Sequence, residues 1–460
     1  MTRTSIPAGL PVPNPTTSYW QTPKHALANH RTTEDLPEHV VDYVVIGSGI
    51  TGTLTSYKLL ENAKRENREI DIVMLEARET CSGATGRNGG HCRAGRYDEF
   101  SDDLDNYGLE EALRLERLEE NTIEAVVALI RKTQIPCDLR RVEGVEMYTD
   151  RKHLERLIAT VKRREQIDEE IRVPKKIWSE EEVKTLLVPN AKGGISFHGW
   201  VLSPYKLICG LLEICLQHND EERQFNLQTT TPVVEIEKPD PRNRTRWRVI
   251  TPRGIVTTKN VILATNAYTA ALYPPLADFI IPTRGQITAL RPGKKIEGNP
   301  ILEKTIMICT EEMCDYFQTR AEWFSGGGDI ILGGGRQAAQ NGHGQFNSEQ
   351  PILDDSTINT KVSRHQAGAF TQHFGEENWG EEGRTIMEWT GIMGYTRDTM
   401  PIVGRADHGL FVCAGFHGHG MALVERSSEA LVGLIEGRGD EVRKWLPKSF
   451  EIERIIGKEG

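Results

Sequence analysis

The sequence lacks the features that mark membrane, secreted and metal-binding chains. No window approaches about 18 consecutive uncharged apolar residues, the length of a membrane span. The N-terminal MTRTSIPAGLPVPNPTTSYW has no apolar core of a secretory signal, and the C-terminal IIGKEG is not a peroxisomal tripeptide. The eight cysteines form no CxxC pair and no Cys/His ligand spacing. We therefore expect reduced, mostly buried thiols, no metal site and a cytoplasmic location.

A local concentration of positive charge is also missing. The formal net charge is −10 and the basic residues are dispersed, so no stripe suited to a phosphate backbone is present and nucleic acid is not an expected partner. An apolar content of 38% with 27% charged residues is typical of a globular protein. At 460 residues, the chain predicts more than one domain, since domains commonly contain about 100–200 residues.

The chain is organised in distinct stretches. Residues 1–40 contain several prolines and no regular period, which predicts an extended N-terminal arm that Tyr19 and Trp20 could pin to the rest. Residues 102–132 predict one helix, and TTTPVVEIE (229–237) predicts a strand. After Pro282, strand-like runs alternate with glycine clusters, as in a mostly antiparallel sheet. The buried face of the predicted helix comprises Leu109, Leu113, Ile123, Val127 and Ile130.

A dinucleotide-binding motif begins the main part of the chain. VDYVVI predicts a strand, GSGITG a glycine turn that opens a helix, and DIVMLEAR a second strand that ends in Glu76. In this motif Gly47 permits the tight turn, Gly49 lets the backbone approach a pyrophosphate, and Gly52 lets helix and strand pack closely. The N–H groups at the helix N-terminus then bind the negatively charged pyrophosphate, and Glu76 accepts hydrogen bonds from ribose hydroxyls. An unrelated glycine turn is the alternative, but the full context of strand, turn, helix and acid disfavours it.

Two further glycine-rich segments favour FAD over a nicotinamide cofactor. SGATGRNGGHCRAG (82–95) follows the second strand at once, and its small residues let the backbone donate N–H groups to an extended cofactor. Near the C-terminus, LFVCAG predicts a strand and FHGHGM (416–421) opens a second helix. That helix N-terminus suits an electron-rich ring edge. Two such junctions in one chain indicate a cofactor held along its whole length.

With these segments the sequence resembles the D-amino-acid oxidase-like FAD oxidoreductases, a family that includes glycine and sarcosine oxidases and gamma-glutamylputrescine oxidase. The matching pieces are VVIGSGITG with LEA, SGATGRNGG, ATNAYT, PTRGQI, WTGIMGYTRDTMPIVG and AGFHGHGM, in the family's order from about Val41 to Ile435. SGATGRNGG is most similar to the gamma-glutamylputrescine oxidase branch. The resemblance implies an α/β fold: a discontinuous Rossmann-type FAD domain (residues 41–100, 198–282 and 385–445) and a substrate domain on a mostly antiparallel sheet (residues 101–197 and 283–384).

The resemblance also implies a set of cofactor-binding residues. The ADP half would contact Gly47, Ser48, Gly49, Thr51, Gly52, Glu76, Ala77, Arg78, Val233, Asn266 and Ala267. The ribityl chain and the ring would contact Ser82, Gly83, Thr85, Gly86, Arg87, Asn88, Gly89, Gly90, His91, Asp398, Gly415, His417, Gly418, His419, Gly420 and Met421. Because GIMGYTRD lacks the cysteine that bonds to flavin in sarcosine oxidases, non-covalent FAD is expected, with His91 as the residue for a covalent bond.

The expected activity is oxidation of a C–N bond in a small amine or amino acid by hydride transfer to flavin N5, giving an imine that hydrolyses. Such chemistry needs orientation and desolvation more than a proton shuttle. The catalytic candidates are His91, His417, His419 and Arg336. An arginine fork would anchor a substrate carboxylate, with Arg87, Arg93, Arg96, Arg284 and Arg336 as candidates, and the pocket walls could include Tyr316, Trp389 and Tyr395. For each of them a purely structural role is the alternative.

The electron acceptor is oxygen or another carrier. Sarcosine oxidases use a lysine to promote the reaction with oxygen, and an approximate alignment places Ile331 there. An oxidase is expected, with a dehydrogenase as the alternative. A NAD(P)-linked flavin reductase would need a second dinucleotide motif, and GGDIILGGGR does not open a convincing helix. A flavin-binding protein without catalysis would lose the ring-facing segments, whereas SGATGRNGG and AGFHGHGM are intact.

Overall fold

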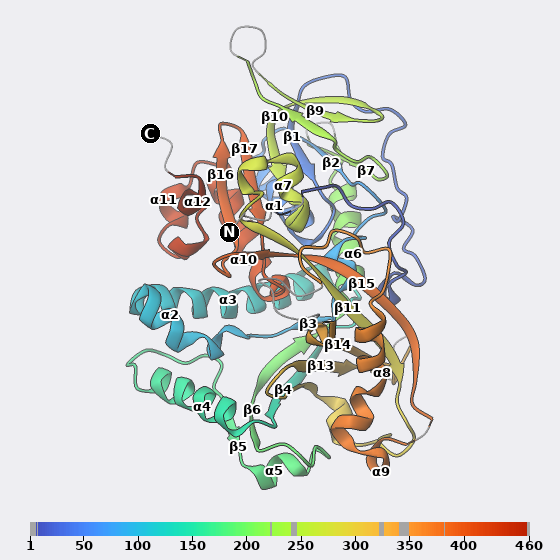
Figure 1. Ribbon diagram of the computed structural model, residues 1–460. Helices are drawn as coiled ribbons and strands as arrows, with labels where there is room; N and C mark the ends of the chain where they lie inside the picture. Colours follow the sequence, from blue (N-terminus) through green and yellow to red (C-terminus); the bar gives the residue numbers. More distant parts are fainter. Residues whose placement is uncertain are drawn as a thin grey trace.

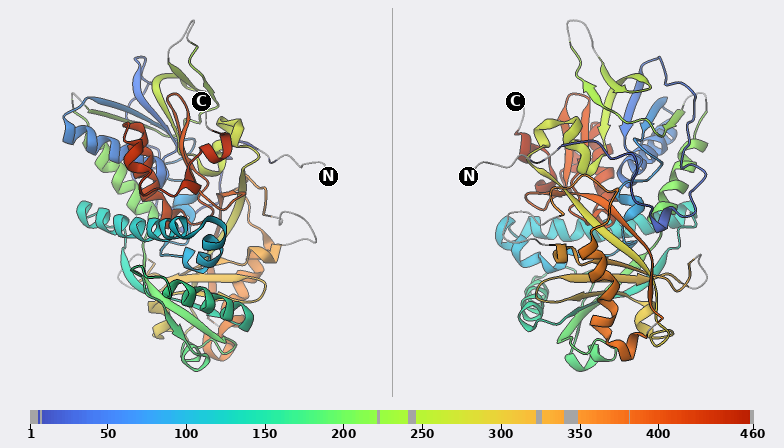
Figure 2. Two further views of the ribbon diagram at one scale, coloured as in Figure 1. Left: turned by 90° about the vertical axis from the view of Figure 1, so that its left-hand side faces the viewer. Right: turned by 45° about the vertical axis from the view of Figure 1, so that its right-hand side comes forward.

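Two β-sheets organise the chain in the computed structural model. The structure describes residue 6 and residues 8–220, 223–240, 246–321, 326–339, 349–380 and 382–457. An eight-stranded sheet lies in the upper half of Figure 1 and a nine-stranded sheet in the lower half. The views in Figure 2 agree that the long helix α3 (Leu109–Thr133) passes between these two halves.

The eight-stranded sheet is the Rossmann-type part of the fold. Its order is β16-β17-β10-β1-β2-β7, with β9 on β10 and β8 on β9, and its central neighbours are parallel. Parallel strands need crossover helices, which explains why the central strands are buried on both faces. The bounds are β1 (Val41–Ile46), β2 (Ile70–Leu75), β7 (Arg223–Gln228), β8 (Glu235–Glu237), β9 (Trp247–Thr251), β10 (Gly254–Leu263), β16 (Ile402–Asp407) and β17 (Leu410–Ala414).

The nine-stranded sheet is antiparallel except where β12 pairs with β4. Its order is β15-β11-β14-β13-β12-β4-β6-β3, with β5 on β6. Ile331 of β14 belongs to the buried cluster shared with the first sheet, whereas Ile330 and Leu332 pack with Phe370 on the other face. The bounds are β3 (His91–Cys92), β4 (Arg140–Tyr148), β5 (Lys176–Trp178), β6 (Gly193–Val201), β11 (Ile280–Arg291), β12 (Thr305–Cys309), β13 (Cys314–Thr319), β14 (Ile330–Gly334) and β15 (Arg384–Thr396).

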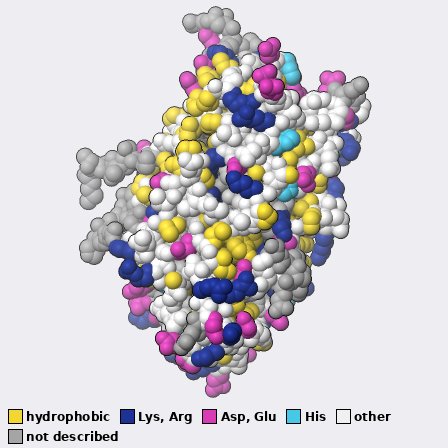
Figure 3. Space-filling view, turned by 90° about the vertical axis from the view of Figure 1, so that its right-hand side faces the viewer, with side chains coloured by type: hydrophobic (Ala, Val, Ile, Leu, Met, Phe, Trp, Pro, Cys, Tyr) yellow, Lys and Arg dark blue, Asp and Glu magenta, His cyan; other side chains and the backbone are white. Residues whose placement is uncertain are grey.

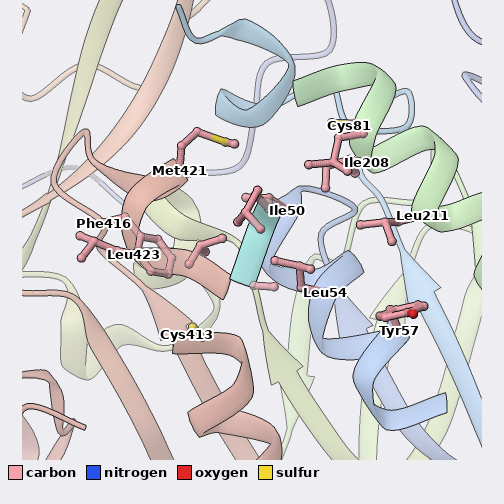
Figure 4. Close-up of a cluster of buried hydrophobic side chains, with 14 of the residues drawn as sticks. Ile50, Leu54, Tyr57, Cys81, Ile208, Leu211, Cys413, Phe416, Met421 and Leu423 are labelled. Atoms are coloured by element: carbon pink, nitrogen blue, oxygen red, sulfur yellow. The ribbon is translucent and has the colours of Figure 1, made fainter. Parts of the chain in front are cut away.

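The helices cover both sheets. Helix α1 contacts α6 and α10, and α10 in turn contacts α3. In Figure 4 the side chains of Ile50 and Leu54 from α1 lie between those of Ile208 from α6 and Leu423 from α10. The remaining bounds are α1 (Ile50–Glu66), α2 (Phe100–Tyr107), α4 (Arg151–Glu165), α5 (Glu180–Lys184), α6 (Pro204–Gln217), α7 (Thr269–Leu272), α8 (Thr360–Phe374), α9 (Glu376–Trp379), α10 (Gly420–Ile435), α11 (Gly439–Val442) and α12 (Glu453–Ile456).

The fold class predicted from the sequence is confirmed. Structural neighbours share the flavoenzyme fold with its Rossmann-type part, and the second sheet is mostly antiparallel, as expected. The division into an FAD domain and a substrate domain stays a proposal. Two strands placed in the FAD domain, β3 and β15, instead pair with β6 and β11 of the nine-stranded sheet, and β6 and β11 themselves cross the expected boundaries.

Two local predictions were wrong. The helix expected over residues 102–132 breaks at Gly108, whose φ of 82° no ordinary residue adopts easily, and Leu109 just after it is 45% exposed. Of residues 229–237 only Glu235–Glu237 form a strand. The N–H groups of Thr230 and Thr231 instead donate to the carbonyls of Arg78 and Glu76, so this segment lies across the end of β2.

Two of the eight cysteines also differ from expectation. Cys309 and Cys314 face each other across the β12–β13 hairpin and form a disulfide, because register places them directly opposite. The other six are buried free thiols. The spacing of Cys309 and Cys314 in the sequence gave no sign of a disulfide, because the hairpin that joins them is not visible as a cysteine motif.

The surface shows no concentration of one charge on the face drawn in Figure 3, where Lys and Arg side chains are interspersed with Asp and Glu. Within the described ranges, every helix is too short or too polar to cross a membrane. The same part of the chain holds no group of three or more His, Cys, Asp or Glu side chains arranged to bind a metal ion.

Candidate functional site

The first glycine turn has the geometry that its spacing predicts. Gly47 ends β1 with a φ of 105°, and a Cβ there would lie 2.8 Å from the Ala264 carbonyl oxygen. A Cβ on Gly52 would lie only 2.0 Å from the carbonyl oxygen of Gly47, so this position admits no side chain. The chain can therefore turn tightly from β1 into α1 and bring the helix close to the sheet.

Glu76 joins this turn to the end of β2. One carboxylate oxygen accepts hydrogen bonds from the N–H and the hydroxyl of Ser48, at 3.0 and 2.7 Å, and the other accepts from the N–H of Arg78. Only 8% of Glu76 is exposed. Because each carboxylate oxygen has two acceptor sites, Glu76 can still take hydroxyl hydrogens, and its charge disfavours a phosphate. Ala77 follows it directly and Val233 is buried just after the segment that lies across β2.

The loop of residues 81–91, hereafter the flavin loop, reaches the first turn. The Thr85 hydroxyl accepts from the N–H of Ile50 at 3.0 Å, at the start of α1. The Ser82 hydroxyl is buried without a partner in the described part of the chain, as is the hydroxyl of Tyr268. A buried polar atom without a partner is rare in a finished fold and marks a place where a ligand can bond.

The second glycine turn lies next to the first. Gly415, His417 and Gly418 all have positive φ angles, of 76°, 49° and 83°, between the end of β17 and the start of α10. The amide oxygen of Asn266 accepts from the N–H groups of Gly415 and Phe416, at 2.9 and 3.4 Å. Ala267 beside it is buried. Because α1 and α10 pack together, with Met421 and Ile50 in one buried cluster, two segments about 370 positions apart in the sequence lie side by side (Figure 4).

The three predicted histidines lie in different surroundings. The Nδ1 of His91 is 2.7 Å from the Thr305 hydroxyl, its ring meets the edge of Tyr316, and its Nε2 is buried without a partner in the described chain. His417 stacks on Tyr395, with ring centroids 4.1 Å apart. His419 is exposed and faces Gly95 instead. Of the three, His417 and His91 point to the sheet that would hold substrate.

Both inward histidines are neutral near neutral pH. Burial, helped by the charge of Arg93, lowers the pKa of His91 to about 3. Burial, followed by the neighbouring His419 and Arg336, lowers the pKa of His417 to about 4. Burial disfavours the charged form because the imidazolium loses its hydration. These rings can therefore accept or donate a hydrogen bond without carrying charge.

Among the five arginine candidates, Arg336 differs from the rest. Arg93 pairs with Glu146 at 2.6 Å, Arg96 with Asp103 at 2.7 Å, and Arg284 with Glu349 at 2.6 Å. Arg87 is buried, and burial lowers its pKa to about 10. Its guanidinium donates to the carbonyls of Ser82, Thr390 and Thr16, and Asp355 lies 3.8 Å away.

Arg336 has no carboxylate partner among the described residues. Its Nη1 donates to the hydroxyl of Tyr395 at 2.9 Å, its guanidinium lies 4.9 Å above the Tyr395 ring, and its Nε is buried with no acceptor in the described chain. It follows β14 in a short 3-10 turn, Arg336–Ala339. We call Arg336, Tyr395 and His417 the arginine cluster. Tyr395 uses one Nη1 hydrogen of Arg336, and the remaining donors of the planar guanidinium have no acceptor in the described chain, which fits a carboxylate.

The three aromatic candidates also differ in their surroundings. Tyr316 is placed between His91 and the arginine cluster, and burial, with the nearby Tyr395, raises its pKa to about 12. Glycine makes room for it, because a Cβ on Gly333 would lie 2.4 Å from its ring. Trp389, in contrast, is fully buried and donates its Nε1–H to the carbonyl of Arg87 at 2.8 Å, which is a structural role.

Two predicted cofactor-binding residues have side chains that form ion pairs with other residues of the protein. The guanidinium of Arg78 pairs with the buried Asp355 at 2.9 Å. The carboxylate of Asp398 pairs with Arg454 at 2.7 Å and caps the N–H of Met400. Any contact that they make with a cofactor would come from the backbone. The sequence gave no signal for Asp355, which lies about 275 positions from both arginines that it joins.

The residues present fit FAD. The unpartnered hydroxyls of Ser82 and Tyr268 and the unpartnered Nε2 of His91 lie on the segments around the two glycine turns, where bare backbone replaces side chains. Glu76 stands at the ribose position of the motif, and the start of α10 offers its N–H groups to an electron-rich ring edge.

Comparison with known proteins gives the family. The family model for FAD dependent oxidoreductases matches residues 42–432. Over 426 residues the chain is 24% identical to the gamma-glutamylputrescine oxidoreductase of Escherichia coli (strain K12), covering 86% of this chain and 84% of that protein. The glycine oxidase from Geobacillus kaustophilus is similar in structure, with a TM-score of 0.67 and 17% identity over 87% of this chain and 95% of that one.

The L-amino acid deaminase from Proteus myxofaciens is another similar structure, with a TM-score of 0.69 and 16% identity over 98% of this chain and 99% of that one. At these identities the solved structures establish the fold. Because the family model spans most of its length, the chain belongs to the FAD-dependent oxidoreductase family and is an enzyme of that class. The resemblance inferred from the sequence is thus confirmed.

Proposed function

We propose that this enzyme oxidises a C–N bond in a small amine that carries a carboxylate, such as an amino acid, to an imine that hydrolyses in water. The observation that carries this proposal is the arginine cluster, where Arg336, beside Tyr395 and His417, keeps guanidinium donors without an acceptor in the described chain. The glycine oxidase and the L-amino acid deaminase to which the chain is similar are named for such substrates. Arginine binds a carboxylate through two parallel hydrogen bonds, which also fix its orientation.

When bound, FAD supplies at N5 of its ring the acceptor for the hydride of the substrate's α C–H. The chain's own residues provide the rest. Arg336 holds the carboxylate, Tyr395 fixes the plane of the guanidinium, and Tyr316 closes the side toward His91. The neutral ring of His417 can accept a hydrogen bond from the substrate nitrogen without carrying a charge of its own.

The test uses pairs of amines that differ only in a carboxylate. Glycine with methylamine, and sarcosine with dimethylamine, are mixed without oxygen with the yellow holoenzyme, and loss of flavin absorbance is followed. We expect the carboxylated member to bleach the flavin faster at equal concentration. Equal rates for both members in every pair would contradict the proposal that the enzyme recognises a substrate carboxylate. No bleaching by any amine would remove amine oxidation itself.

We propose that FAD is bound without a covalent bond and that oxygen reoxidises it, with another carrier as the alternative. The buried Ile331 favours that alternative, since it provides no charge on the sheet face where sarcosine oxidases are expected to place lysine. Reduced holoenzyme is mixed with air-saturated buffer or with an artificial dye acceptor. Faster reoxidation by oxygen at equal concentration supports the oxidase, and faster reoxidation by the dye supports a dehydrogenase.

A further inference from the structure

The N-terminal arm has an unexpected position. Its residues 16–21 lie before the region that the family model matches, which begins at residue 42. The sequence gave no location for them. In the structure this segment, hereafter the clasp, runs along the flavin loop, and Ser18 and Trp20 are 0% and 6% exposed. An arm that only covered the surface would not bury these side chains.

Three side chains of the clasp bind carbonyl groups of the flavin loop. The hydroxyl of Ser18 donates to the Gly86 oxygen at 2.7 Å. The indole N–H of Trp20 donates to the Asn88 oxygen at 2.6 Å, and the Gln21 amide donates to the Cys81 oxygen at 3.1 Å. The clasp therefore satisfies carbonyl groups from the beginning, the middle and the end of the loop.

A fourth contact runs in the opposite direction. The guanidinium of Arg87, in the middle of the flavin loop, donates to the carbonyl and the hydroxyl of Thr16, at 2.6 and 3.2 Å. The Thr16 hydroxyl in turn accepts from the N–H of Thr390 in β15 at 2.9 Å. The clasp is thus held between the flavin loop and the nine-stranded sheet.

The hydroxyl of Tyr19 gives the clasp a second attachment that does not involve the flavin loop. Its hydroxyl donates to a carboxylate oxygen of Asp329 at 2.8 Å, and its ring stacks on Trp389 at 6.3 Å. Within one segment, therefore, Ser18 and Trp20 bind the loop, whereas Tyr19 binds the sheet. This division supplies a matched control.

The contacts fix the direction in which the loop peptides point. In a planar trans peptide the C=O and the following N–H point to opposite sides. Binding of the Gly86 and Asn88 oxygens on the clasp side therefore turns the N–H groups of Arg87 and Gly89 away from it. The Arg87 N–H closes the short 3-10 helix Ala84–Arg87, whereas the Gly89 N–H has no acceptor in the described chain. The Gly89 N–H is then available to the cofactor along which the loop runs.

We propose that the clasp is part of the FAD site: Thr16 to Gln21 hold the peptides of the flavin loop in the orientation that presents the Gly89 N–H to the cofactor. This assigns a positioning role to residues outside the matched family region. It does not depend on which substrate is oxidised, so failure of the proposed function leaves it intact. Loss of the clasp contacts is expected to free the loop peptides to rotate and to weaken FAD binding.

The test compares single substitutions in the full-length chain. Trp20→Phe keeps an aromatic ring but removes the donor to Asn88, and Ser18→Ala removes the donor to Gly86. Tyr19→Phe is the matched control, because it removes a hydroxyl of the same segment that bonds to Asp329 instead. The dissociation constant for FAD is measured by the change in flavin fluorescence on binding, together with the visible absorption spectrum of bound FAD and the Tm of the FAD-free protein.

We expect Trp20→Phe and Ser18→Ala each to weaken FAD binding about tenfold and to shift the flavin spectrum, with an FAD-free Tm no lower than that of Tyr19→Phe. Ser18→Thr, which restores a hydroxyl, should recover affinity. Wild-type affinity and spectrum in both loop-side variants would overturn the proposal. So would a loss of affinity equal to that of Tyr19→Phe and matched by its fall in Tm, because the clasp would then only stabilise the fold.

Discussion

The guanidinium of Arg336 donates to the hydroxyl of Tyr395 at 2.9 Å and lies over its ring, while no described carboxylate forms an ion pair with it. The Nε of Arg336 is buried without an acceptor in the described chain, which is costly unless a ligand completes it. Four other arginines in the candidate set are satisfied by protein groups. The pair of Arg336 and Tyr395 is therefore the feature of the structure that most directly indicates an anionic substrate group.

Replacement of Arg336 by Met should raise KM for a carboxylated amine on the order of 100-fold, because the charge-assisted hydrogen bonds are lost. KM for the matched amine without the carboxylate should change little. Steady-state kinetics with both substrates measures this difference. Arg284→Lys is the control, since Arg284 is bound to Glu349 and should alter stability and leave KM unchanged. Equal effects of Arg336→Met on both substrates would contradict the anchoring role.

Asp315 should make a large contribution to stability through two histidines of α8. His365 and His373 each place Nε2 2.9 Å from its carboxylate. Burial raises the pKa of Asp315, but the hydrogen bonds from both histidines outweigh it and the net pKa is lowered. The hydrogen bond to Asp315 raises the pKa of His365. Asp315→Asn should lower the free energy of unfolding by about 3–5 kcal/mol at pH 6, measured by urea denaturation.

The pH dependence of this cluster has a defined sign. The contribution of Asp315 is present above its unfolded pKa of about 3.9 and is lost as pH falls through its lowered folded pKa. The contribution of His365 is complete below about 6.5 and is lost as pH rises through its raised folded pKa. In wild type, Tm should therefore fall as pH rises from about 6.5 through that folded pKa. The same decline in Asp315→Asn would show that the pair does not cause it.

His91 should make the protein sensitive to acid. Its folded pKa of about 3 lies below the unfolded value of 6.5, so the unfolded chain binds the proton first and stability falls as pH drops from 6.5 toward 3. At pH 5 this amounts to about 2 kcal/mol. Urea denaturation of wild type and His91→Gln at pH 7 and pH 5 measures the difference. An identical loss in both proteins would assign the acid sensitivity elsewhere.

When the protein is denatured, FAD should be released from it in unmodified form. Acid precipitation of the holoenzyme is expected to give a colourless pellet and a yellow supernatant whose spectrum is that of free FAD. A yellow pellet would instead show a covalent bond, and His91 would then be its first candidate because its Nε2 is neutral, buried and without a described partner. His91→Gln would in that case release the colour.

The sequence predicted the parts of this molecule that depend on local pattern. Strand, glycine turn and helix around Gly47, and the second turn before α10, follow from spacing that any βα junction requires. The break at Gly108 was missed because apolar periodicity continues across it, and the Thr230 segment was missed because tertiary hydrogen bonds replaced a strand ladder. Local propensity cannot report either kind of competition.

The composition of the site was predictable only in part. The sequence singled out Arg336 only by its place after LGGG on an expected substrate strand, and its partners in space are what separate it from Arg87 and Arg284. The clasp around Ser18 and Trp20 had no sequence signal beyond two aromatic residues in a proline-rich stretch. Contacts between segments hundreds of residues apart depend on the whole fold, which is why they could not be inferred beforehand.

The central claim is that two distant glycine turns bind one FAD that accepts electrons from a carboxylated amine. The most direct test measures the FAD content of the purified chain and then titrates it, without oxygen, with such an amine while flavin absorbance is recorded. The account predicts one FAD per chain and complete bleaching. A chain that binds no FAD, or whose flavin stays oxidised with every carboxylated amine, would contradict it.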